Sequence, residues 1–105
     1  MPVLGAAQDT YEIEKPLWTR ALSGNVVDSN GSKIPDVLVE LLSLDKQNVK
    51  GKVLTSANGS FGFSGKRKGR YLLRLTKEGW SPLYVTVGIN KRAHKHLQLT
   101  MLIAR

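Results

Sequence analysis

The stretch GRYLLRLTKEGWSPLYVTVGI, residues 69–89, decides the fold class. Large apolar residues occupy every second position in two runs: Tyr71, Leu73, Leu75, and Val85, Val87, Ile89. Such alternation places one set of side chains on a single face of a β-strand. Glu78-Gly79 between the runs suits a turn. The stretch therefore predicts two strands, each with one buried face.

The same alternation recurs on both sides of this stretch. It covers residues 22–28, 37–42, 53–63 and 97–103, and no segment shows a helical period over a convincing length. About seven strands separated by turn residues are typical of two packed sheets. The pattern therefore predicts an all-β, seven-stranded antiparallel Greek-key β-sandwich.

Turn chemistry refines this prediction at two places. Asn30-Gly31 and Asn58-Gly59 each suit a tight reversal, and the second is predicted to close a hairpin between residues 53–55 and 61–63. Residues 45–52 are polar and are predicted to form a loop.

The first 19 residues lack the alternation of the rest. They contain Pro2 and Pro16 and sustain neither a period of 2 nor one of 3.6. We expect residues 1–19 to be a flexible arm or linker, with Leu17 and Trp18 against the domain edge. Residues 20–105 then form one domain, which suits a chain of 105 residues.

Charge is unevenly distributed along the chain. The net charge is +8, yet residues 1–14 carry three acidic side chains and neither lysine nor arginine. A strongly basic body attracts polyanions and anionic surfaces, although basic side chains also serve solubility alone.

Several classes of chemistry find no support in the residues. The chain has no cysteine, so disulfides, thiolate catalysis and cysteine-ligated metals are excluded. No apolar run approaches the roughly 18 residues of a transmembrane helix. His94 and His96 could face one metal from a strand, but no third ligand stands near them and neighbouring cations disfavour the site. No catalytic triad or carboxylate pair is evident, and we expect no metal, no cofactor and no catalysis.

Two basic clusters are candidate ligand contacts. One comprises Lys66, Arg67, Lys68 and Arg70, and the other comprises Lys91 and Arg92 with Lys95. If the fold brings them to one end of the sandwich, they suit sulfate, phosphate or carboxylate groups. Nucleic acid is disfavoured, since the nearby aromatic residues are expected in the core. The alternative is that both clusters are solvated loops.

Trp80 and Tyr84 are a second candidate contact. Together they could offer flat aromatic faces to a sugar ring. The alternative is that Trp80 covers the open end of the core.

The motifs from residue 22 to residue 103 resemble the carboxypeptidase regulatory-like domain, a member of the prealbumin-like (transthyretin-like) superfamily of sandwiches. The resemblance is carried by these residues: Gly24-x-Val26-x-Asp28-x-x-Gly31, Ile34-Pro35-x-Val37-x-Val39, Thr55-x-x-x-Gly59-x-Phe61-x-Phe63, Gly69-x-Tyr71-x-Leu73-x-Leu75 and Glu78-Gly79-Trp80.

This resemblance implies a non-catalytic structural or interaction module of a cell-envelope or secreted system. It implies a periplasmic, secreted or cell-surface location, with a protein or carbohydrate ligand. A carbohydrate-binding domain and a polyanion-binding domain that uses the basic loops remain the alternatives. Hydroxyisourate hydrolases share the broad fold, but their Tyr-Arg-Gly-Ser ending has no counterpart in Thr100–Arg105.

Overall fold

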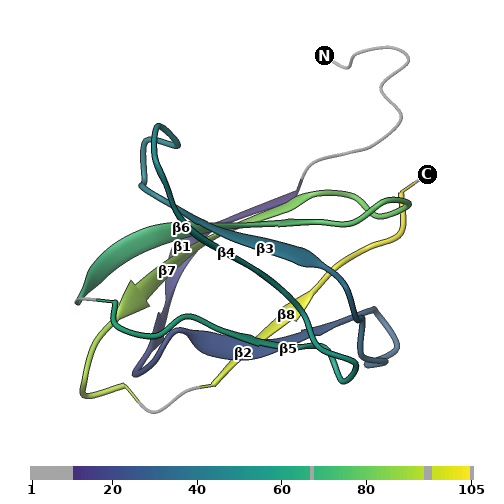
Figure 1. Ribbon diagram of the computed structural model, residues 1–105, viewed down its shortest axis with the longest axis horizontal. Coiled ribbons are helices and arrows are strands. Elements are labelled where there is room, and N and C mark those ends of the chain that lie inside the picture. The colour runs from purple at the N-terminus through teal and green to yellow at the C-terminus, as the bar shows by residue number, and fades with distance from the viewer. Residues whose placement is uncertain (1–10, 67, 94–95, 105) are drawn as a thin grey trace.

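Two β-sheets form the protein, one with five strands and one with three (Figure 1). The computed structural model describes residues 11–66, 68–93 and 96–104. The strands in these residues are β1 (Tyr11–Thr19), β2 (Ser23–Val27), β3 (Leu38–Leu42), β4 (Val49–Leu54), β5 (Ser60–Gly62), β6 (Gly69–Thr76), β7 (Leu83–Ile89) and β8 (Leu97–Thr100). Neighbours follow the order β1-β7-β6-β3-β4 in the large sheet and β5-β2-β8 in the small sheet.

Aliphatic side chains from both sheets fill the space between them. Each such side chain contributes about 1.5–3 kcal/mol when fully removed from water. The most deeply buried members are Val26, Val39, Leu41, Leu73, Leu75, Val85, Val87 and Leu99. These are alternate residues of their strands, so the predicted all-β sandwich is confirmed.

Two strand pairs are parallel, so the sheets are mixed. β1 runs parallel to β7, and β2 runs parallel to β8. In both pairs the partners are far apart in the chain, because a tight turn cannot join parallel strands. Alternation reports which face a side chain takes and says nothing of strand direction. The prediction of a wholly antiparallel sandwich is therefore wrong at these pairs, and the described residues hold eight strands instead of seven.

Strand β1 occupies part of the predicted arm. Residues 11–19 pair with residues 83–89 of β7 at the edge of the large sheet. The register shifts in the middle of β1, around Pro16, and this irregularity interrupts the alternation that marks a strand in sequence. The prediction of a flexible arm is therefore wrong for residues 11–19, which form a strand of the large sheet. Residues 1–10 lie outside the described residues.

The turn at Asn58-Gly59 connects the two sheets. The Gly59 N–H donates to the Ser56 carbonyl, so the chain reverses as expected. However, β4 pairs with β3 in the large sheet, whereas β5 pairs with β2 in the small sheet. The predicted hairpin is therefore wrong, because turn chemistry does not specify which sheet receives the next strand. Strand β4 also includes residues 49–52 of the predicted loop.

A row of polar side chains crosses the outer face of the large sheet. In register from β1 to β4, it runs Glu12, Tyr84, Arg74, Glu40 and Lys52. The Arg74 Nε donates to Glu40 Oε1 at 2.8 Å. This hydrogen bond holds the pKa of Glu40 below its ordinary value of 4.5, although partial burial opposes the shift. The pair thus ties β6 to β3 on the solvent side.

Thr55 fastens the segment that leads into β3. Its buried Oγ1 accepts a hydrogen bond from the Val37 N–H at 2.9 Å and donates one to the Ile34 carbonyl at 2.8 Å. Both backbone partners are otherwise removed from water beside the core, where an unpaired polar group is costly. The Thr55 hydroxyl therefore provides a hydrogen-bond partner to two buried backbone groups.

Thr55→Val is expected to lower the free energy of unfolding by about 3 kcal/mol, because it leaves these two backbone groups unpaired. Urea denaturation followed by tryptophan fluorescence measures the change. The matched control is Thr100→Val, an exposed side chain at the end of β8, which should alter stability by less than about 0.5 kcal/mol. Equal effects of the two substitutions would contradict this role of Thr55.

The Glu40–Arg74 pair should make stability depend on acid. A carboxyl whose pKa is lower in the folded state stabilises the fold fully above its unfolded pKa, and this contribution is lost as pH falls below 4.5 and through the folded-state pKa. Between neutral pH and about pH 3, the wild type should therefore lose more stability than Glu40→Gln. The urea midpoints of both proteins at the two pH values measure the loss of stability. Identical losses in the wild type and in Glu40→Gln would refute a contribution of the Glu40–Arg74 pair.

Candidate functional site

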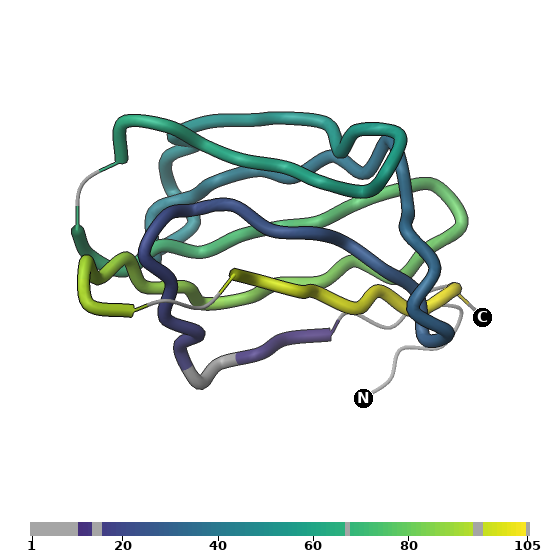
Figure 2. Tube along the Cα trace, turned by 90° about the horizontal axis from the view of Figure 1, so that it is seen from below, coloured from purple at the N-terminus to yellow at the C-terminus, as the bar shows by residue number. Residues whose placement is uncertain are grey.

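Basic side chains gather at one end of the sandwich around a hollow of about 520 Å³. Arg20, Lys66, Lys68, Ile89 and Lys91 line it, and we call it the basic hollow. In Figure 2 the turn after β1, the segment before β6 and the segment after β7 reach this same end of the molecule. Three distant parts of the chain thus supply the lining, so the hollow is a product of the fold.

Strand register explains why these residues meet. Ile89 at the end of β7 pairs with Thr19 on one side and with Gly69 on the other. Arg20 directly follows Thr19, and Lys68 directly precedes Gly69. Lys91 comes two residues after Ile89. All three cations therefore lie just beyond the same edge of the large sheet, where β1 and β7 end and β6 begins.

Hydrogen bonds order the backbone around the basic hollow. The Asn90 N–H donates to the Thr19 carbonyl at 2.9 Å, which ties the end of β7 to the end of β1. The Asn90 Oδ1 accepts the Arg92 N–H at 3.0 Å and thereby shapes the following turn. On the far side, Lys66 Nζ donates to the Lys50 carbonyl at 3.1 Å. Lys66 is thus held against β4.

Among the described residues, the lining of the basic hollow contains four cationic side chains and no carboxylate. Among the side chains that the structure describes, the ion pair is that of Arg74 with Glu40, on the outer face of the large sheet. Uncompensated like charges around a concavity repel one another and focus a positive potential into it. The arrangement is suited to holding an anionic group.

The structure brings together part of the two predicted basic clusters. Lys66 and Lys68 from the first cluster and Lys91 from the second line the same hollow. Arg70 and Arg92 are exposed beside this end of the sheet but do not line the hollow. Arg67 and Lys95 lie outside the described residues. Sequence reasoning missed Arg20, because it was assigned to the border of an arm.

Trp18 is a further candidate that the sequence prediction did not single out as a contact. It lies on β1 with 43% of its surface exposed, opposite Gly88 of β7. A Cβ built on Gly88 would overlap the indole ring, so the ring lies directly over the glycine. A glycine inside an alternating strand often marks such a close approach, and Gly88 was the available signal.

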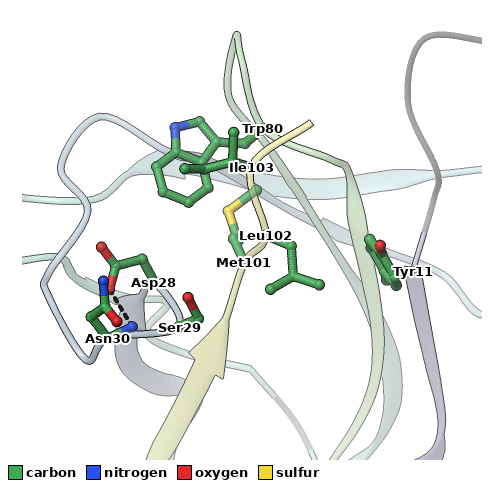
Figure 3. A pocket seen from close by; sticks show the side chains of 8 residues that line it. All are labelled: Tyr11, Asp28, Ser29, Asn30, Trp80, Met101, Leu102 and Ile103. Carbon is green, nitrogen blue, oxygen red and sulfur yellow. Dashed lines mark hydrogen bonds between the residues drawn. The ribbon is translucent and has the colours of Figure 1, made fainter. Parts of the chain in front are cut away.

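Trp80 lies in a different place, at the opposite end of the sandwich. Figure 3 shows its indole beside Ile103, with Asp28 and Asn30 on a facing turn, around a hollow of about 150 Å³. Trp80 is partly buried and packs against the core, and its backbone forms an isolated antiparallel β-bridge with that of Ile103. These contacts are those of a side chain that closes the end of the core.

Tyr84 lies on the outer face of the large sheet, where Lys46 covers one face of its ring. The Lys46 Nζ lies 4.6 Å from the centre of its ring. Arg74 lies opposite Tyr84 in register, and hydrogen bonding to Glu40, with a smaller contribution from Tyr84, raises the pKa of Arg74. Trp80 and Tyr84 thus have separate surroundings.

The structure gathers no metal site in its described residues. Within residues 11–66, 68–93 and 96–104, no three histidine or acidic side chains group closely enough to hold a metal ion. His96 is exposed at the start of β8, and His94 lies outside the described residues. The described part of the chain also has no helix with the length and apolar character of a membrane span.

Comparison with known structures supports the fold. The chain is similar to a 5-hydroxyisourate hydrolase of Klebsiella pneumoniae, with 18% identity, a TM-score of 0.59, and coverage of 86% of this chain and 92% of the hydrolase. It is also similar to BcpA, the major pilin subunit of Bacillus cereus, with 19% identity and a TM-score of 0.57. That match covers 79% of this chain and 27% of the pilin. At such identities the likeness concerns the fold alone.

A family model gives the more specific result. No curated protein matches the chain. The model of the carboxypeptidase regulatory-like domain matches residues 21–102, which span both sheets from the segment before β2 to the residues after β8. The expected resemblance is thereby confirmed, and the chain belongs to the carboxypeptidase regulatory-like domain family.

Proposed function

We propose that the chain is a non-catalytic interaction module of a protein that works outside the cytoplasm, in the periplasm, at the cell surface or secreted. Membership of a regulatory-like domain family supports the non-catalytic role. The similar fold of a pilin subunit supports an extracytoplasmic setting. The module holds or contacts a partner through its surface.

The observation that carries this proposal is the filled interior. Val39, Leu41, Leu73, Leu75 and Val85 are 0% exposed between the sheets. Among the described residues, every buried side-chain nitrogen or oxygen has a hydrogen-bond partner. Such an interior stabilises the sandwich and leaves the solvent-facing surface to recognise other molecules. A sandwich of this kind serves as a rigid support for surface contacts.

The purified protein is expected to leave 5-hydroxyisourate, p-nitrophenyl esters and peptide amides at their uncatalysed rates, because its function is binding. Absorbance assays with and without added divalent metals measure the rates. Turnover that scales with protein concentration and disappears in His96→Ala would overturn the non-catalytic assignment.

The extracytoplasmic setting has its own test. The full-length natural product that contains this chain, carrying an epitope tag, is expected in the periplasmic, surface or culture fraction of its host. Fractionation with a cytoplasmic marker enzyme as control measures the distribution. Recovery solely with the marker enzyme would contradict the proposed setting.

A further inference from the structure

We propose that Trp18 and the basic hollow together bind an acidic saccharide, a sugar chain that carries carboxylate or sulfate groups. This inference rests on the proposed interaction function and names the chemistry of the ligand. It combines an aromatic platform for a sugar ring with cations for its anionic groups.

The platform is the exposed face of the Trp18 indole. Because the ring lies directly over Gly88, the backbone of β7 supports it from beneath while 43% of the residue remains exposed. The C–H groups on one face of a sugar ring carry partial positive charge, and an aromatic face carries the complementary negative charge. A ring supported in this way has little conformational freedom to lose when a sugar packs on it.

The platform lies near the Arg20 side of the basic hollow, whose lining does not include Trp18 itself. Trp18 precedes Arg20 by two residues, so their Cα atoms lie within about 7 Å of each other. Gly88 pairs with Trp18 on one side and with Arg70 of β6 on the other. Arg70 is exposed and lies two strands from Trp18 in the sheet. A sugar on the indole would therefore have cations on two sides.

The basic hollow supplies the charge complement. Arg20, Lys66, Lys68 and Lys91 line an open hollow of about 520 Å³, and no carboxylate is among the described residues of its lining. Bound anions relieve the mutual repulsion of the four cations. Arg20 can hold a carboxylate or a sulfate through two parallel hydrogen bonds, and the lysines add charge with less directional demand.

The geometry favours a saccharide over other polyanions. Sites for single-stranded nucleic acid stack successive bases on several aromatic side chains, whereas the described lining of the basic hollow includes none and Trp18 supplies a ring nearby. Tryptophan residues that anchor proteins to bilayers project into the interface, whereas the Trp18 indole packs against the backbone of β7 at Gly88. A concave cationic basin beside a single flat ring matches alternating sugar rings and anionic groups.

Isothermal titration calorimetry tests the site with oligogalacturonate, which carries carboxylates, and with a heparin oligosaccharide, which carries sulfates. A neutral oligosaccharide of equal length, single-stranded DNA and vesicles containing phosphatidylglycerol are the comparison probes. The folded protein is expected to bind at least one acidic oligosaccharide, more weakly as salt rises, and to bind it more tightly than the comparison probes.

Substitutions then locate the site. Trp18→Ala, Arg20→Ala and Lys68→Ala should each weaken binding about tenfold, because each removes a stacking or charge contact. Gly88→Ala should weaken binding as well, since its Cβ displaces the ring that it supports. The matched control is Lys33→Ala, an exposed lysine beyond β2 at the other end of the sandwich, which should bind as the wild type does. Thermal melting confirms that each variant is folded.

Four results would overturn the proposal. The first three are no acidic-saccharide binding by the folded wild type, equal weakening in Lys33→Ala, and binding that survives Trp18→Ala and is lost in Trp80→Ala. The fourth is tighter binding of DNA or vesicles, which would reject a saccharide as the ligand. None of these results bears on catalysis, so the proposed non-catalytic function fails separately, through turnover.

Discussion

The parallel pairing of β1 with β7 is the contact on which the candidate site depends. It adds a fifth strand to the large sheet and ends where Thr19 meets Ile89. Leu17 packs against the core from this strand, while its neighbour Trp18 takes the opposite face over Gly88. Arg20 then leaves the strand toward the basic hollow. Without β1, neither the indole platform nor the guanidinium would stand beside the lysines.

The two ends of the sandwich differ in chemistry because different turns close them. At one end, Arg20, Lys66, Lys68 and Lys91 leave an open cationic concavity. At the other end, the partly buried Trp80 and its bridge to Ile103 cover the core. The filled interior between them keeps both ends in place. Function in such a domain therefore resides in what the strand ends and outer faces present.

Most of the sandwich could be predicted from alternation, because burial on one face imposes a period of 2 on the sequence. Leu73, Leu75, Val85 and Val87 obey it and are buried as expected. Strand β1 escaped the prediction because its register shifts around Pro16. The parallel strand pairs were not predicted either, because the direction of a strand does not change its hydrophobic pattern.

The candidate site was harder to foresee than the fold. Lys66, Lys68 and Lys91 could be singled out from local charge, but their meeting with Arg20 depends on the register of three strands. Trp18 could have been found through Gly88, a glycine without a turn in the run from Val85 to Ile89. Recognising that clue requires knowing which strand lies beside β7.

Amide hydrogen exchange by NMR tests the pairing of β1 with β7 most directly, at the N–H groups that donate from Tyr11 to the Pro82 carbonyl and from Asn90 to the Thr19 carbonyl. Both amides are predicted to exchange far more slowly than in an unstructured peptide, and exchange at the unstructured rate while β6 stays protected would contradict the account.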